Sequence, residues 1–234
     1  LMDEVAPPFD WLCSRYYRLT IEGMDDVPYG PALMVGNHNS GTSFYEAIGM
    51  GARWYVERGS SDLVQGLAHD AVVDTPYIGN LMVRLGTVRA SHETAAAVFA
   101  KGRKITVFPG GNLEAFRPYR DRHKVVFAGR KGFIRLAVRH QVPIVPMVHI
   151  GGHETFFILH DGQFIAKALG FDKLIRSDTW PLMFALPWGI ALGPLFHLPL
   201  PAKCSVRFLE PVRTDSYAVS DAETRMPSKK STTK

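Results

Sequence analysis

Two short runs of aliphatic and β-branched residues are each followed at once by a glycine-rich turn. The first run is Ala32-Leu33-Met34-Val35, ahead of a turn at residues 36–42. The second run is Lys104-Ile105-Thr106-Val107, ahead of a turn at residues 108–114. Both runs are typical of buried strands. If the two strands are parallel in one sheet, their turns lie at the same edge, where open α/β sheets usually bind ligands.

The first turn carries His38, between Asn37 and Asn39. An imidazole in this place can take a proton from a substrate hydroxyl at neutral pH. A histidine among Asn, Ser and Gly can equally be a turn residue that bonds the nearby backbone. In the second turn, Pro109 fixes one φ angle, and the two glycines after it let the backbone approach a ligand closely.

The rest of the chain predicts a mixed α/β order in one domain, residues 1–227, with a polar and disordered tail at 228–234. We expect Ser91 to cap the helix that Gly102 ends. The expected strands are 18–21, 33–35, 53–56, 105–108, 144–150 and 204–208, and the expected helices are 44–50, 61–71, 78–85, 92–101 and 131–140.

Composition narrows the classes of partner. The net charge of +5 suits an anionic membrane face or an anionic cofactor. We expect no nucleic-acid partner, because the chain has no basic stripe interleaved with aromatic residues and no zinc-finger spacing. Two distant cysteines predict no disulfide framework. His149, His153 and Glu154 flank a Gly-Gly pair, a spacing that matches no helical zinc motif, so we expect no metal. No pattern indicates an oligomeric state.

From about Tyr17 to Val212 the chain resembles the PlsC-like glycerolipid acyltransferases. Asn37-His38 resembles that family's first block, Asn-His followed by an aspartate. The turn at 108–112 resembles its third block, Phe-Pro-Glu-Gly-Thr-Arg, and residues 142–146 match its Val-Pro-Ile-Val-Pro strand residue for residue. The resemblance implies an α/β fold with a mixed, mostly parallel sheet flanked by helices. It also implies transfer of a fatty acyl group from acyl-CoA or acyl carrier protein to a glycerolipid or lysophospholipid hydroxyl, with His38 as general base and no bound cofactor.

The family's acid usually stands five positions after the histidine, where this chain has Ser43. Some members carry the acid eight positions after it, where this chain has Glu46. Such a carboxylate fixes the tautomer of the imidazole and stabilises the imidazolium. Glu46 could instead be a solvated residue early in a helix, where it favours the helix dipole.

Gly110 stands where the members that use phosphate carry glutamate, and Leu113 where they carry arginine. This Phe-Pro-Gly-Gly form resembles the branch related to monoacylglycerol and diacylglycerol acyltransferases, which favours a neutral acceptor. Four cations at 117, 120, 122 and 124 point the other way, because they could bind a phosphate or coenzyme A. They could also form a solvated loop. The family's second block is usually Gly, then an aromatic residue, then Arg, and this chain matches it poorly with Gly86-Thr87-Val88-Arg89. Arg89 is the nearest candidate in this block for binding an anion. The residues we expect to bind substrate are Asn37, Ser40, Gly41, Arg89, Phe108, Pro109, Gly110, Gly111, Asn112, Glu114, Arg117 and Lys131.

Residues 179–202 contain no Asp, Glu, Lys or Arg but five prolines, which disfavour a straight spanning helix. Three interpretations stay open: an interfacial or acyl-binding surface, a buried core loop, or a spanning or re-entrant segment. The side chains expected to contact membrane or acyl chain are Trp180, Phe184, Trp188 and Phe196. We expect the protein at the cytoplasmic face of a membrane, bound peripherally or through an N-terminal segment outside this chain.

Two other functions fit the sequence. A non-catalytic lipid-binding protein on the same fold is compatible with the missing aspartate at position 43. A hydrolase could use Ser40 or Ser43 beside His38, although the chain has no Gly-x-Ser-x-Gly elbow.

Overall fold

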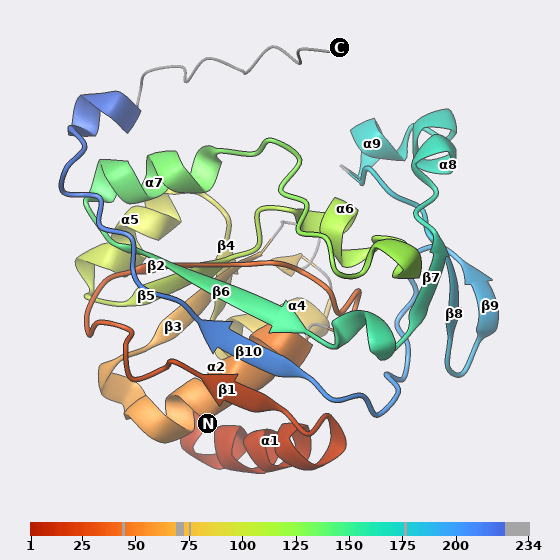
Figure 1. The fold of residues 1–234 in the computed structure, drawn as a ribbon, viewed down its shortest axis with the longest axis horizontal. Helices are drawn as coiled ribbons and strands as arrows, with labels where there is room; N and C mark the ends of the chain where they lie inside the picture. Colours follow the sequence, from red (N-terminus) through yellow and green to blue (C-terminus); the bar gives the residue numbers. More distant parts are fainter. Residues whose placement is uncertain (44, 69–72, 75, 176, 223–234) are drawn as a thin grey trace.

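A mixed seven-stranded sheet forms the centre of the molecule, with strand order β1-β10-β6-β2-β5-β3-β4, and β7-β8-β9 form a second, three-stranded sheet (Figure 1). The structure is a computed structural model that describes residues 1–43, 45–68, 73–74, 76–175 and 177–222. The tail expected at 228–234 lies outside these residues.

The elements follow one another in an alternating α/β order. The strands are β1 (Thr20–Glu22), β2 (Leu33–Gly36), β3 (Val64–Ala68), β4 (Thr87–Arg89), β5 (Lys104–Val107), β6 (Ile144–Ile150), β7 (Phe157–His160), β8 (Leu182–Ala185), β9 (Gly189–Leu192) and β10 (Ser205–Phe208). The helices are α1 (Met2–Tyr16), α2 (Tyr45–Arg58), α4 (Ile78–Arg84), α5 (His92–Ala100), α6 (Gly111–Ala115), α7 (Gly132–His140), α8 (Gln163–Ala168) and α9 (Phe171–Leu174).

Strand β2 lies in the middle of the large sheet and is parallel to both of its neighbours, β5 and β6. Strand β3 is parallel to β5 and β4, and β1 is parallel to β10. Only the pairing of β10 with β6 is antiparallel among the pairs described in this sheet. The predicted class, an α/β fold with a mostly parallel sheet flanked by helices, is confirmed.

Two hydrophobic cores cover the faces of the sheet, because alternate strand residues point to opposite sides. Met34 packs into the core that contains Trp54 of α2, whereas Leu33 and Val35 pack into the core that contains Phe99 of α5. Figure 1 shows α1 and α2 on one face and α5 and α7 on the other. A strand buried on both faces explains why residues 33–35 are apolar without alternation.

Two predicted elements are wrong. The strand expected at 53–56 is the second half of α2, where Trp54 lies one turn after Met50 and both are buried. Arg53 is bonded to Asp10 of α1 at 2.7 Å, so packing against α1 overrides the β-propensity of these residues. Within the helix expected at 61–71, residues 64–68 instead form strand β3, which inserts between β5 and β4, and residues 69–71 lie outside the described part of the chain.

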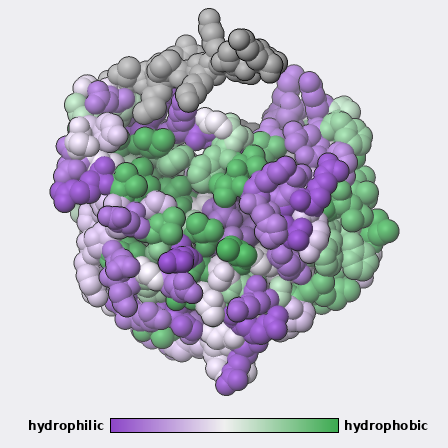
Figure 2. Space-filling model, viewed as in Figure 1, coloured by the Kyte–Doolittle hydropathy of each residue, from purple (hydrophilic) through white to green (hydrophobic). Residues whose placement is uncertain are grey.

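Within the uncharged segment 179–202, β8 and β9 form a hairpin, and β8 also pairs with β7. After β9 the chain returns past this hairpin, where Leu198 forms an isolated bridge with Leu186. Within the described part of the chain no helix is long and apolar enough to cross a membrane. The outward side of this small sheet is apolar, with Phe184, Ile190 and Leu192 exposed. Figure 2 shows this face as a hydrophobic area at the right of the molecule.

Candidate active site

The two glycine-rich turns meet at one edge of the sheet. Strands β2 and β5 run parallel with Val35 opposite Val107, so the residues after both strands emerge side by side. The ring of His38 lies 5.1 Å, between centroids, from that of Phe108. The two turns therefore meet at the carboxyl ends of parallel strands, the edge at which open α/β sheets usually bind ligands.

His38 and Glu46 are in contact: the ring Nδ1 meets Oε1 of the carboxylate. Glu46 belongs to the first turn of α2 and is completely buried. The same oxygen accepts the backbone N–H groups of Asn39 at 3.1 Å and Ser40 at 3.3 Å. Burial alone would raise the pKa of Glu46, but the charge and hydrogen bond of His38, with the hydrogen bond from the Asn39 N–H, hold that pKa below its usual value. Glu46 is thus a buried carboxylate directed at the imidazole, and not a solvated helix residue.

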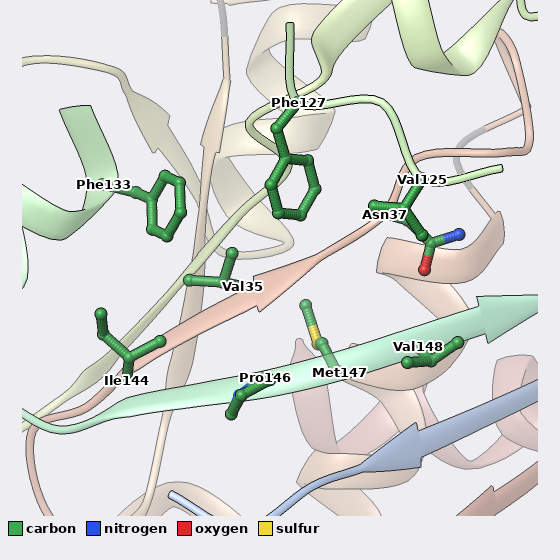
Figure 3. A pocket seen from close by; sticks show the side chains of 9 residues that line it. All are labelled: Val35, Asn37, Val125, Phe127, Phe133, Ile144, Pro146, Met147 and Val148. Carbon is green, nitrogen blue, oxygen red and sulfur yellow. The ribbon is translucent and has the colours of Figure 1, made fainter. Parts of the chain in front are cut away.

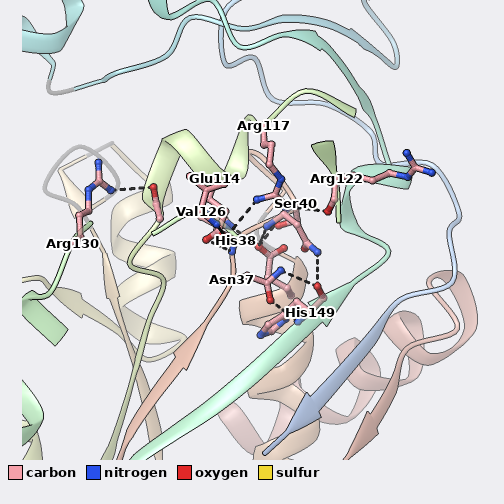
Figure 4. Close-up of polar contacts among 12 residues, drawn as sticks. Asn37, His38, Ser40, Glu114, Arg117, Arg122, Val126, Arg130 and His149 are labelled. Carbon is pink, nitrogen blue, oxygen red and sulfur yellow. Dashed lines mark hydrogen bonds and ion pairs between the residues drawn. The ribbon is translucent and has the colours of Figure 1, made fainter. Parts of the chain in front are cut away.

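Two asparagines anchor the histidine turn to β6. The Asn37 side chain donates to the carbonyl of His149 at 2.9 Å and accepts its N–H at 2.8 Å. Asn39 donates to the same carbonyl at 2.9 Å. Gly41 has a φ of +55°, and a Cβ there would lie 2.6 Å from the Phe156 ring, so only glycine fits. The turn is held rigidly on both sides of His38 (Figure 4).

Glu114 is enclosed within the protein and bonded to two backbone N–H groups. It is completely buried, and its two oxygens accept the N–H groups of His38 at 3.0 Å and Val126 at 2.8 Å. Arg117 is also buried, 3.4 Å from Glu114. Burial raises the pKa of Glu114 above its usual value, although the bonds from the two N–H groups and the charges of Arg117 and His38 act in the opposite direction. The contact of either side chain with substrate, expected from the sequence, has no support in this geometry.

The second turn leads into the short helix α6. Gly111 donates its N–H to the Phe108 carbonyl at 3.0 Å, so this N–H is already used within the turn. The side chain of Asn112 donates to Ser177 at 3.1 Å. The Pro109 and Gly110 carbonyls each accept Arg130 at 3.0 Å, and Figure 4 shows this arginine reaching the turn.

Two adjoining hollows open beside Asn37. One, of about 280 Å³, is apolar and is lined by residues such as Val35, Phe127 and Phe133 (Figure 3). The other, of about 260 Å³, is polar, with Arg122 among its lining residues. The two share Asn37, Val125 and Val148. The hollows therefore reach Asn37, the immediate neighbour of His38, from an apolar side and from a side that carries Arg122, Lys124 and Glu154, while His38 itself lines neither.

The four cations at 117, 120, 122 and 124 lie in three different environments. Arg117 is buried, whereas Arg120 and Lys124 are exposed and pair with Asp121. Arg122 lies 3.3 Å from Glu154 and covers the Tyr119 ring. Only Arg122 and Lys124 of the four line the polar hollow.

Arg89 and Lys131 are not brought to His38. Arg89 ends β4, three strands away from β2, and pairs with Asp74 at 2.6 Å. At about 4.8 Å per strand this separation is roughly 14 Å. Lys131 is the residue before α7 and lines neither of the two hollows beside Asn37.

Buried imidazoles surround the pair His38–Glu46. Burial, with smaller effects of neighbouring charges, lowers the pKa of His149 to about 4 and that of His153 to about 3. Within the described residues, neither nitrogen of the His149 ring has a hydrogen-bond partner. Both histidines are therefore neutral at physiological pH. In the described part of the chain no cluster of His, Cys, Asp and Glu could hold a metal ion.

The four aromatic residues of segment 179–202 lie in different environments. Phe184, Trp188 and Phe196 are exposed, and the Trp188 indole donates to the Phe196 carbonyl at 2.6 Å. Trp180 instead packs on Phe171 at 4.4 Å and is only half-buried, so it does not belong to the exposed surface.

The sequence does not reveal how the hairpin reaches the histidine turn. Thr42 donates to the Leu195 carbonyl at 2.8 Å and lies 3.2 Å from His197. These residues are more than 150 positions apart, and no local pattern announces the contact. The roles of Asn39 and Glu114 as anchors of His38 are likewise visible only in the folded chain.

The chain belongs to the acyltransferase family: residues 18–150 match the family described as Acyltransferase. It is 30% identical over 223 residues, 95% of its length, to an uncharacterized protein of Mycobacterium tuberculosis. The chain spans 60% of that relative.

Two more distant relatives are named for their enzymatic activities. The chain is 25% identical to the mouse DGAT1/2-independent enzyme synthesizing storage lipids, over 61% of this chain and 42% of that one. It is 26% identical to human diacylglycerol O-acyltransferase 2, over 53% and 37%. The crystal structure of PlsC, the 1-acyl-sn-glycerophosphate acyltransferase of Thermotoga maritima, covers 95% of this chain with a TM-score of 0.55 and 17% identity; the match spans 75% of PlsC. The chain therefore has the PlsC fold, and the resemblance read from the three blocks is confirmed.

Proposed function

We propose that this chain is an O-acyltransferase that moves a fatty acyl group from an acyl thioester to a hydroxyl of a glycerolipid. The contact between His38 Nδ1 and the buried Glu46 carboxylate, at the carboxyl ends of parallel strands, carries the proposal. With Nδ1 held by Glu46, the imidazole presents Nε2 as the base. Family membership supplies the reaction class.

In the proposed reaction, Nε2 of His38 removes the proton of the acceptor hydroxyl as its oxygen attacks the thioester carbonyl. Glu46 stabilises the imidazolium that forms. The tetrahedral intermediate then expels the thiolate, which takes the proton from His38. One ester bond forms and one thioester bond breaks, so no acyl-enzyme and no metal are needed.

The backbone at the start of α6 provides the oxyanion donors in this proposal. Gly110 and Asn112 are the candidates, because the Gly111 N–H already donates to Phe108. Preorganised N–H groups of this kind stabilise developing charge without reorganisation, and loss of one costs about 10²–10³-fold in other acyl-transfer enzymes.

The two hollows suit the two ends of an amphiphilic substrate. The apolar hollow is suited to an acyl chain, and the polar hollow, which Arg122 and Lys124 line together with Glu154, to an anionic group such as a phosphate of coenzyme A or of the acceptor. Arg122 and Lys124 thus favour an anion, while Gly110 favours a neutral acceptor by resemblance.

The exposed apolar hairpin supports action at a membrane surface. Trp188 and Phe196 are more than half exposed, at 56% and 59%, on a segment without charged residues. Large apolar faces of this kind bury well in the interfacial region of a bilayer. We propose peripheral attachment of this face to the cytoplasmic side of a membrane.

The test is product identification. Purified protein is incubated with labelled acyl-CoA, or labelled acyl carrier protein, and a panel of lysophospholipids, monoacylglycerols and diacylglycerols. We expect a labelled glycerolipid from at least one acceptor. Binding of acyl-CoA and acceptor without any product would instead identify a lipid-binding protein on the same fold.

A further inference from the structure

Glu114 connects three segments that meet at the catalytic turn. It belongs to α6, and its carboxylate accepts the N–H of His38 at 3.0 Å through Oε2 and the N–H of Val126 at 2.8 Å through Oε1. Arg117 lies 3.4 Å from Oε1. The side chain is completely buried, so these bonds form in a low-dielectric surrounding where charge-assisted bonds are strongest.

Gly110 provides the space for this carboxylate. A Cβ at position 110 would lie 2.3 Å from Oε2 of Glu114 and 2.5 Å from its Cβ. The backbone of Gly110 is right-handed, with φ −65° and ψ −28°, so its conformation alone does not require glycine. The backbone carbonyl of Val126 would also lie 2.5 Å from that Cβ, so the glycine is required by the positions of Glu114 and of the Val126 segment that Glu114 binds.

We propose that Glu114 is a positioning residue for His38: its carboxylate holds the backbone N–H of the base and thereby fixes the imidazole between Glu46 and the substrate. The inference rests on the proposed function for its catalytic part. It also accounts for Gly110 without reference to the charge of the acceptor, because any side chain at this position would displace Glu114.

The histidine turn is anchored by hydrogen bonds at several points, and Glu114 provides the anchor of the His38 N–H. Asn37 and Asn39 bond to β6, and Glu46 holds the ring. None of these groups takes the N–H of His38, which goes to Glu114. Loss of this bond removes the Glu114 acceptor from a part-buried backbone donor and lets the turn shift.

Glu114→Gln tests the proposal. Glutamine has one acceptor oxygen and one NH₂ group, so it can accept only one of the two N–H groups and presents a donor to the other. We expect kcat to fall about 10–100-fold with KM little changed, because a displacement near 1 Å has an effect of this size. Asp62→Asn is the matched control, since Asp62 is a buried carboxylate paired with Lys104 and Arg58 at the other end of β5. It should reduce thermal stability and leave kcat unchanged.

A spectroscopic readout separates this inference from the proposed function. With ¹⁵N-histidine labelling, the amide resonance of His38, identified by its loss in His38→Ala, should shift upfield in its proton dimension in Glu114→Gln, because the N–H then either loses its acceptor or donates to a neutral amide oxygen. Glu114→Asp, which keeps the charge beside Arg117 but shortens the reach, should shift it in the same direction and is the second variant if Glu114→Gln does not fold.

The outcomes discriminate clearly. An unchanged His38 amide resonance in a folded variant overturns the positioning role, whatever the enzymatic activity. A shifted resonance without any acyl transfer by the wild-type protein supports the geometry and refutes the proposed function. A loss of kcat that follows thermal stability, as in a purely structural role, also overturns the inference.

Discussion

Replacing Glu46 by glutamine should separate its catalytic contribution from its structural one. The carboxylate uses Oε1 for three donors, the His38 ring and the N–H groups of Asn39 and Ser40, whereas Oε2 has no hydrogen-bond partner in the described part of the chain. An amide can keep its oxygen in the place of Oε1. The bonds survive as neutral bonds, each weaker by about 1 kcal/mol, and the cost of a buried charge disappears.

We therefore expect Glu46→Gln to change the free energy of unfolding by less than about 2 kcal/mol, and the rate by much more. Without the negative charge the imidazolium is not stabilised, and kcat should fall by roughly 10²–10⁴-fold, the full contribution of the base. Glu46→Ala removes the acceptor as well. Two buried N–H groups are then unsatisfied, at roughly 1–3 kcal/mol each, so this variant should also lose stability.

The assay is kcat and KM with labelled acyl-CoA, together with thermal unfolding of each variant. Glu57→Gln is the control on the same helix, because Glu57 is exposed and lies 3.5 Å from Arg53. It should change neither quantity. If Glu46→Gln retains a kcat within about threefold of wild type, the carboxylate does not assist His38 and the proposed mechanism is wrong.

Three further predictions follow from separate features. Burial lowers the pKa of His153 to about 3, so below about pH 6.5 the unfolded chain binds a proton that the folded protein does not. The free energy of unfolding should therefore be about 2 kcal/mol smaller at pH 5 than at pH 7 from this residue, and His153→Phe should remove that slope in denaturant titrations. Trp188→Ser with Phe196→Ser should weaken sedimentation with liposomes more than thermal stability, whereas Tyr77→Ser, also exposed, should not weaken it; unfolding with unchanged binding would place the hairpin in the core. Lys124→Gln should raise KM for acyl-CoA or for a phosphate-bearing acceptor at low salt, and an unchanged KM for both would show that the polar hollow does not bind the substrate's anionic group.

Local signals predict those parts of the fold that depend on neighbours in the sequence. Strand β6 spans Ile144–Ile150 as expected, and Ser91 accepts the N–H of Thr94 at 3.0 Å as an N-cap. Glu46 could be singled out because it lies only eight positions from His38, on the helix that the turn enters. Such features need few long-range contacts.

Features that depend on distant packing were not predictable. Residues 53–56 favour a strand by composition, but contact with α1 makes them helical. Glu114 lies 76 positions from His38, and its burial follows from the parallel pairing of β2 and β5. Arg117 looks like a solvated cation in the sequence and is buried beside Glu114. Sequence alone does not reveal which charged residues a fold encloses.

The most direct measurement is the initial rate of acyl transfer by wild type and His38→Ala under identical conditions. With the acceptor that gives product, the rate should fall about 10²–10⁴-fold, because the base is removed while Glu46 and the sheet stay in place. Thermal unfolding and liposome binding should be nearly unchanged, and His92→Ala, at an exposed histidine on α5, should retain the full rate. Near-native turnover by His38→Ala would contradict the assignment of His38 as the base.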